Sequence, residues 1–237
     1  MVETNLLSPQ IGAVIGTSAE PVSLADVETI RACLDDRLVV VLPGQTLDPP
    51  TLHEFMDGFG PAHIHHADDD VLFVRELPEV LEMRKDPDGE RLFGGGGWHA
   101  DVTFQEPCGA ITGLYASVVP PVGGDTLFAN AIAAFEAMSP RMQDLLRELR
   151  AIHSYDGPGC PDRNGLTAVH PVVRRHPATG HEGLYVNTMF VTRFEGMTPE
   201  ETHPLLQYLE AHITRPERVC RVQWEPGHLV LWDNRFT

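Results

Sequence analysis

The spacing of apolar residues along the chain predicts four helices, each beginning at a residue that can cap a first turn. The first begins where Ser23 and Asp26 have the spacing of a capping box. The other three begin where Asp48, Ser139 or Thr198 precedes a proline, a residue favoured in the first helical turn. The second helix is predicted to run through Phe55. The predicted buried faces of the other three, which we interpret as core, are Leu24, Val27, Ile30 and Leu34 in the first helix, Met142, Leu145, Leu146 and Leu149 in the third, and Leu205, Leu206, Leu209 and Ile213 in the fourth.

Short runs of β-branched and aromatic residues between these helices are typical of strands. They cover residues 38–42, 71–75, 111–119, 126–130, 183–187, 219–224 and 228–232. Long segments rich in Gly and Pro separate several of them, which favours a β-sandwich of jelly-roll type with flanking helices over a doubly wound parallel sheet. We find no internal repeat and no linker, so residues 1–237 are predicted to form a single domain.

The overall charge of the chain is strongly negative. Its 237 residues carry a formal net charge of −17, and they contain no basic run. Nucleic-acid binding requires clustered Lys and Arg, so we expect a small-molecule partner and no nucleic acid. The N-terminus lacks the pattern of a signal peptide and no apolar run reaches the length of a membrane span, which predicts a cytoplasmic protein without a membrane partner. The sequence leaves open whether the protein forms a homo-oligomer.

The cysteines and the common catalytic motifs narrow the chemistry further. Four widely spaced cysteines form no C-x-x-C pair, so we interpret Cys33, Cys108, Cys160 and Cys220 as reduced thiols. The chain contains no G-x-S-x-G, H-E-x-x-H or G-x-x-x-x-G-K motif. These absences argue against a serine hydrolase of the α/β type, a zinc protease of the H-E-x-x-H type and a P-loop nucleotide-binding protein.

One short stretch, GGGGWHADVTF at 94–104, carries the spacing of a metal-ligand pair. In a strand, alternate side chains share a face, so His99 and Asp101 would project together while Trp98, Ala100 and Val102 project on the other side. The pattern is not specific by itself, because residues 66–68 also read His-Ala-Asp. The spacing alone therefore leaves two candidate pairs.

Seven stretches occur in the order typical of one enzyme family. They are RLVVVLPGQTL, FGPAHIH, WHADVTF, GGDTLFAN, HPVVRRHPATGHEGLYVN, FEGMTPEET and WEPGHLVLWDNRFT. Together they resemble the taurine dioxygenase and 2,4-D dioxygenase family of iron(II)/2-oxoglutarate-dependent oxygenases, from near residue 11 to the last residue. The resemblance implies a double-stranded β-helix, that is, a jelly roll, with flanking helices, and it implies Fe(II), 2-oxoglutarate and dioxygen as cofactor and cosubstrates.

The resemblance also distinguishes between the two candidate pairs. His99 and Asp101 stand in the family's W-H-x-D-x-x-F context, whereas Asp68 continues into an acidic stretch that we interpret as a solvated turn. Iron(II) held by two His and one carboxylate keeps positions open for a 2-oxo acid and dioxygen. Such enzymes decarboxylate 2-oxoglutarate to succinate and CO2 while oxidising a substrate carbon. The presence of Asp101 favours hydroxylation, since halogenating relatives carry a small residue in its place.

Further site residues are carried over from the family by position. Thr126 matches a threonine that contacts 2-oxoglutarate, and Trp232 a wall of the cosubstrate site. His65 matches a position that can bind the anionic group of the substrate, and Tyr155 and Phe190 match positions that line the pocket. Without the resemblance, each would be interpreted as an ordinary strand, core or surface residue. The remaining histidines, interpreted as structural, include His153, His170, His176 and His203.

The third metal ligand of the family would fall beyond the last residue given, Thr237. The resemblance places it at position 239 as a histidine, with the arginine that binds the far carboxylate of 2-oxoglutarate further on; Arg235 is not that arginine. Within the chain His228 is the nearest alternative ligand, at the far start of its strand. We expect that the natural protein continues, because ending in mid-motif would remove a strand and expose a sheet edge. The alternative is a catalytically inactive jelly-roll protein with an incomplete metal site.

The expected activity is therefore hydroxylation of a small, anionic organic acid or a related metabolite. Hydroxylation next to a heteroatom would cleave the substrate, as in the breakdown of sulfonates, sulfate esters or aryloxy acids. Hydroxylation elsewhere would produce a biosynthetic intermediate, and the sequence leaves both open. Gly95 stands where taurine-cleaving relatives carry a polar residue, which argues against taurine itself.

Overall fold

The computed structural model describes residues 4–16, 21–62, 72–74, 77–84, 97–154 and 166–237. Its strands are β1 (Thr4–Leu6), β2 (Ala13–Ile15), β3 (Val39–Leu42), β4 (Leu72–Val74), β5 (Leu77–Glu82), β6 (Ile111–Tyr115), β7 (Thr126–Ala129), β8 (Arg150–Ser154), β9 (Thr167–Pro171), β10 (Val173–Arg175), β11 (Glu182–Leu184), β12 (Val191–Phe194), β13 (Val219–Val222) and β14 (Leu229–Asp233). Its helices are α1 (Val27–Arg37), α2 (Pro49–Asp57), α3 (Ala131–Glu136), α4 (Pro140–Glu148) and α5 (Pro199–Ile213), with short 3-10 helices at Leu24–Asp26 and Pro216–Arg218. None of the helices in the described residues is long and apolar enough to span a membrane.

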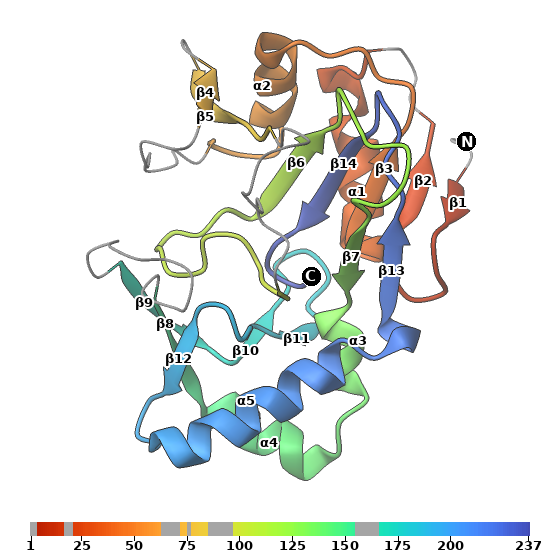
Figure 1. Ribbon diagram of the computed structural model, residues 1–237. Helices are drawn as coiled ribbons and strands as arrows, with labels where there is room; N and C mark the ends of the chain where they lie inside the picture. The colour runs from red at the N-terminus through yellow and green to blue at the C-terminus, as the bar shows by residue number, and fades with distance from the viewer. Residues whose placement is uncertain (1–3, 17–20, 63–71, 75–76, 85–96, 155–165) are drawn as a thin grey trace.

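Strand β14 lies in the interior of the largest sheet, whose strand order is β1-β2-β3-β14-β6 (Figure 1). Strands β3 and β6 pair with it from either side, both antiparallel. Leu229, Val230 and Leu231 are 0% exposed, so this strand is buried on both faces. A strand in that position contains consecutive apolar residues instead of an alternation with polar ones. This explains the unbroken apolar run that the sequence shows there.

The two faces of this sheet are covered by different layers. On one face Leu231 packs in a cluster with Ile30 of α1. On the other face Val230 packs in a cluster with Phe128 of β7 and Val222 of β13, and these two strands form their own antiparallel pair. The protein therefore has a helical layer, the large sheet, and a second sheet that faces it across a hydrophobic core.

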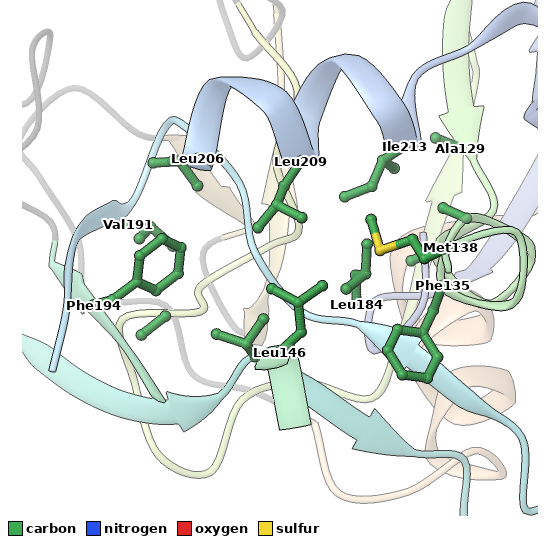
Figure 2. Close-up of a cluster of buried hydrophobic side chains, with 14 residues drawn as sticks. Ala129, Phe135, Met138, Leu146, Leu184, Val191, Phe194, Leu206, Leu209 and Ile213 are labelled. Atoms are coloured by element: carbon green, nitrogen blue, oxygen red, sulfur yellow. The ribbon is translucent and has the colours of Figure 1, made fainter. Parts of the chain in front are cut away.

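A third hydrophobic cluster joins the helices α3, α4 and α5 to the sheet β12-β8-β9 (Figure 2). Leu146 of α4, Phe194 of β12 and Leu209 of α5 are each 0% exposed in it. Figure 1 shows α4 and α5 together, at the end of the molecule away from α2. Trp98 packs partly buried against the same cluster, which anchors the chain one residue before His99.

The four predicted helices are confirmed, and their first turns are capped as the sequence indicates. The Ser23 backbone N–H donates to Asp26 Oδ2 at 3.0 Å, which is half of the expected capping box. In the other three helices the capping side chain accepts from a backbone N–H of the first turn, namely Asp48 from Thr51, Ser139 from Met142 and Thr198 from Glu201.

Some sequence-based expectations about burial and strands were wrong or incomplete. Leu24 and Leu145 were expected in the core but are 55% and 47% exposed. Each predicted strand run does overlap a strand, although β6 ends at residue 115 instead of 119 and β11 ends at residue 184 instead of 187. The described residues hold seven further strands that the pattern did not predict, together with helix α3; the strands are β1, β2, β5, β8, β9, β10 and β12. Cys33, Cys108 and Cys220 are free, as expected, and Cys160 lies outside the described residues.

Candidate metal centre

His99 and Asp101 lie side by side, although the backbone between them is not the strand that we expected. Residues 101–104 form a turn, and Val102 has the left-handed value φ = 48°. The prediction that strand geometry brings His99 and Asp101 together is therefore wrong. The turn nevertheless brings His99 Nε2 to 3.6 Å from Asp101 Oδ1. Metal–nitrogen and metal–oxygen bonds of about 2.1 Å at right angles would bring two such atoms to about 3 Å, so a small adjustment would fit an ion.

The other ring nitrogen of His99 shows which tautomer this arrangement favours. Nδ1 lies 3.0 Å from the Gly97 carbonyl oxygen, which can only accept, so Nδ1 carries the proton. Nε2 then presents its lone pair beside the Asp101 carboxylate, as a metal-binding imidazole does. In the absence of metal, hydrogen bonding to Asp101 raises the pKa of His99 above its ordinary value, against the opposing effect of burial. The donor set of the pair suits a divalent cation.

The residues that the structure describes contain no group of three or more His, Cys, Asp or Glu side chains placed to hold a metal together. Within them, His99 and Asp101 are a pair. Both are partly accessible, with side chains 28% and 32% exposed. His99 and Thr237 also line one small cavity, with Ala129 at the end of β7 and Tyr185 beyond β11. The last residue of the chain therefore lies close to the candidate ligands.

His228, the alternative ligand within the chain, lies at the wrong end of β14. It precedes the strand, and its ring is engaged by Glu225, whose backbone N–H donates to Nδ1 at 3.3 Å. Asn234, which contacts Asp101, follows the other end of the strand. A strand rises about 3.3 Å per residue, so the five residues of β14 separate the two ends by more than about 13 Å. His228 does not reach the pair.

Thr126 and Trp232, the predicted cosubstrate residues, lie on β7 and β14. The Thr126 hydroxyl accepts a hydrogen bond from the Trp224 indole N–H at 2.9 Å. This contact fixes the oxygen and leaves the hydroxyl proton to be donated, which is what a carboxylate ligand requires. Trp232 is half-buried; its ring packs against Phe128, with centroids 5.3 Å apart, and its indole N–H donates to Asn234 Oδ1 at 2.8 Å.

Of the three predicted substrate residues, the structure places Phe190 beside His99. The two rings meet edge to face with centroids 6.1 Å apart, and Phe190 also contacts Phe104 at 5.0 Å. These aromatic rings form an apolar wall next to the candidate ligands. His65 and Tyr155 lie outside the described residues, as does the second His-x-Asp pair at 66–68.

Arg235 pairs with the residue two positions before it. Its Nε donates to Asp233 Oδ1 at 2.8 Å, and the Asp233 side chain is 1% exposed. Burial opposes ionisation of Asp233, but hydrogen bonds from Arg235 and His176 hold the pKa of this carboxyl below its usual value. Arg235 thus pairs with a carboxylate of its own stretch of chain.

Contacts that the sequence analysis did not identify surround the turn that carries Asp101. The hydroxyl oxygen of the buried Thr103 lies 2.9 Å from His153 Nδ1. The backbone carbonyl of Thr103 accepts a hydrogen bond from His170 Nε2 at 2.8 Å. Thr112 donates to Asp101 Oδ2 at 3.1 Å. No local signal could have identified Thr112, because a threonine in a strand is expected from β-propensity alone.

Comparison with known proteins gives a consistent picture. Residues 3–237 match the model of a family described as taurine catabolism dioxygenase TauD, TfdA family. An alpha-ketoglutarate-dependent sulfate ester dioxygenase of Pseudomonas putida is 32% identical, covering 100% of this chain and 82% of that protein. The alpha-ketoglutarate-dependent 2,4-dichlorophenoxyacetate dioxygenase of Cupriavidus pinatubonensis is 31% identical, covering 91% and 83%.

The fold comparison extends this similarity to three dimensions. The crystal structure of a taurine dioxygenase from Burkholderia xenovorans superimposes with a TM-score of 0.85 at 32% identity, covering 99% of this chain and 80% of that one. Dioxygenases of this type have the jelly-roll fold, so the predicted fold class is confirmed.

Proposed function

Because the chain belongs to the TauD, TfdA family and is an iron(II)- and 2-oxoglutarate-dependent dioxygenase, we propose that His99 and Asp101 hold its iron. The observation that carries this assignment is the 3.6 Å approach of His99 Nε2 to Asp101 Oδ1, with the His99 proton placed on Nδ1 by Gly97. Two His and one carboxylate are the ligands of this class of iron site, and they keep positions open for other ligands.

Thr126 and Trp232 are proposed to hold the cosubstrate. The Trp224 indole fixes the Thr126 oxygen, so that the hydroxyl proton can be donated to a carboxylate of 2-oxoglutarate. Iron(II), when bound, supplies the redox chemistry by which dioxygen converts 2-oxoglutarate to succinate and CO2 and oxidises the substrate. Trp232 would form a wall of this site, while Phe190 and Phe104 would exclude water from the reacting side of His99.

The proposed substrate is a small organic anion. Relatives are named for a sulfate ester and for 2,4-dichlorophenoxyacetate, and both of these compounds are acids. The apolar wall of Phe190 and Phe104 suits the carbon skeleton of such a compound. His65 and Tyr155 are retained as proposals for its anionic group and its pocket. Hydroxylation of a carbon beside the sulfate or aryloxy oxygen would cleave the compound.

The proposed iron site is completed by a histidine two residues beyond Thr237. The family pattern W-D-N-R-x-T-x-H supplies this position, and Thr237 and His99 line the same cavity. On this proposal residues 1–237 form a single oxygenase domain. Arg235, which pairs with Asp233, is not proposed as the arginine for the far carboxylate of 2-oxoglutarate.

The test is Asp101→Ala, with Asp68→Ala as the matched control from the duplicate His-x-Asp pair. Asp101→Ala should abolish iron(II) binding and succinate formation, because a ligand is lost, while circular dichroism and thermal unfolding stay close to wild type. Asp68→Ala should behave as wild type. Succinate is measured under air with iron(II), 2-oxoglutarate and a panel of sulfonates, sulfate esters and aryloxy acids. Full activity of Asp101→Ala, or loss of iron binding in Asp68→Ala, would show that the wrong pair was chosen.

A further inference from the structure

Thr112 connects the carboxylate of Asp101 to β6, the edge strand of the large sheet that pairs with β14. Its hydroxyl, on β6, donates to Asp101 Oδ2 at 3.1 Å and contacts Asn234 Nδ2. Asn234 Oδ1 accepts from the Trp232 indole N–H at 2.8 Å and from the Asp101 backbone N–H at 3.3 Å. Thr112 and Trp232 are direct partners in the pairing of β6 with β14. The carboxylate is therefore tied to two paired strands.

The direction of each hydrogen bond follows from groups that can act in one way only. The Trp232 indole and the Asp101 backbone nitrogen can only donate, so the oxygen of the Asn234 amide faces them. The Asn234 nitrogen consequently faces Thr112 and donates to its hydroxyl oxygen. The Thr112 hydroxyl proton is then directed to Asp101 Oδ2. Because a β-branched side chain has few χ1 rotamers, Thr112 is a rigid donor in this position.

The two oxygens of the Asp101 carboxylate thus have different environments. Oδ2 accepts from Thr112, whereas Oδ1 lies 3.6 Å from His99 Nε2. A carboxylate can bind a cation through one oxygen or chelate it through both. Chelation takes up one more coordination position, and the chemistry of this class of site depends on positions that are kept open. A donor that engages Oδ2 favours the one-oxygen mode.

We infer that Thr112 is a positioning residue that holds Asp101 as a one-oxygen metal ligand and so keeps a coordination position open. The inference rests on the proposed function, because it applies only if His99 and Asp101 bind the iron. Asn234 has a supporting part, since its amide N–H donates to the Thr112 hydroxyl oxygen and leaves the hydroxyl proton for the carboxylate. Thr112 contacts the ligand and not the metal, so its effect is exerted through Asp101.

The test compares Thr112→Val with Thr112→Ser. Valine keeps the branched shape without the hydroxyl, and serine keeps the hydroxyl. The matched control is Thr202→Val, since Thr202 is 3% exposed and its hydroxyl accepts from the Phe194 N–H in another part of the fold. Iron(II) affinity is measured by anaerobic titration, and the absorption band of the iron(II)–2-oxoglutarate chelate is recorded. The ratio of succinate to oxidised substrate is measured under air.

In Thr112→Val we expect iron(II) affinity to fall by about 10-fold or more, as is usual when a partner of a metal ligand is removed. The chelate band should shift, and succinate should exceed oxidised substrate. Thr112→Ser and Thr202→Val should match wild type in all three measurements. A folded Thr112→Val protein with unchanged iron affinity and an unchanged band would overturn the inference. If Thr112→Val does not fold, Thr112→Ala is judged by the same criteria.

Asp101→Ala in the same titration separates this inference from the proposed function. If Asp101→Ala binds iron(II) as wild type does, the proposed metal pair is wrong and the role of Thr112 fails with it. If Asp101→Ala loses iron binding while Thr112→Val retains wild-type affinity and spectrum, the metal pair stands and only the role of Thr112 is rejected.

Discussion

At the scale of single residues, the backbone of Val102 is the unusual feature of the turn that carries Asp101. Its φ of 48° lies in the left-handed region, which costs an L-residue about 1–2 kcal/mol and is rare for a β-branched side chain. Such strain persists only where contacts with the surrounding structure hold the backbone in that conformation. Here the next residue, Thr103, is 1% exposed and is held by contacts to His153 and His170. The two histidines therefore stabilise a turn that no local propensity favours.

The strain at Val102 predicts an inverted order of two substitutions. At most sites a protein with glycine is less stable than the same protein with alanine, because glycine gives the unfolded chain more conformational freedom. At a left-handed position the Cβ of alanine is unfavourable, so Val102→Gly should be more stable than Val102→Ala by about 1 kcal/mol. Urea unfolding of the two variants measures the difference. If alanine proves the more stable residue, Val102 does not have the left-handed conformation in solution.

At the scale of elements, local chemistry was readable from the sequence and distant pairing was not. The capping residues Asp48, Ser139 and Thr198 marked helix starts correctly because a cap acts within one turn. Short strands such as β8 and β12 were missed because their pairing partner lies some 40 residues away. The pattern of apolar residues along a helix also does not show how wide its buried face is. For this reason Leu24 and Leu145 were wrongly assigned to the core.

In the candidate site, too, a local feature could be predicted from the sequence and a distant contact could not. The spacing offered two candidate pairs, and the family resemblance favoured His99 with Asp101. These two side chains do lie together, although a turn and not a strand brings them there. The support for Asp101 was unpredictable, because Asn234 is 133 residues away in the sequence. Contacts of that length depend on the sheet order, in which β14 lies between β3 and β6.

The cap of α5 gives a prediction at this scale. Thr198 accepts from the Glu201 N–H while Glu201 Oε2 accepts from the Thr198 N–H, which is a complete capping box. Thr198→Ala should therefore lower the free energy of unfolding by about 1 kcal/mol. Gln207→Ala, on an exposed position of the same helix, should change it by less than about 0.5 kcal/mol. Equal effects of the two substitutions in urea unfolding would show that the cap does not stabilise α5.

At the scale of the whole molecule, stability depends on two opposing electrostatic effects. The formal net charge of −17 makes the folded chain repel itself, and protonation at lower pH relieves that repulsion. Buried neutral histidines act in the other direction, because they resist the proton that the unfolded chain accepts. The side chain of His153 is 0% exposed, and among the described residues its Nε2 is the one buried side-chain nitrogen or oxygen without a hydrogen-bond partner. The two effects cannot be separated in the wild-type protein alone.

A single substitution isolates the contribution of His153. Burial, with the positive charge of Arg174 and the neighbouring His170, lowers the pKa of His153 from 6.5 to about 3. The unfolded chain binds the extra proton, so the stability associated with neutral His153 is complete above pH 6.5 and is lost as the pH falls toward 3. Between about pH 7.5 and pH 5.5 the loss should be about 1.4 kcal/mol. The His153→Gln variant cannot take up this proton, and the charges of the rest of the protein stay the same.

The measurement is the free energy of urea unfolding for wild type and His153→Gln at both pH values. The stability advantage of wild type over the variant should shrink by about 1.4 kcal/mol on going to the lower pH. Leu146→Ala, a core variant without a titrating group, should show the same deficit at both. A pH-independent difference between wild type and His153→Gln would mean that His153 accepts its proton in the folded state. Neutral His153 could then not be what holds Thr103 and the turn carrying Asp101 in place.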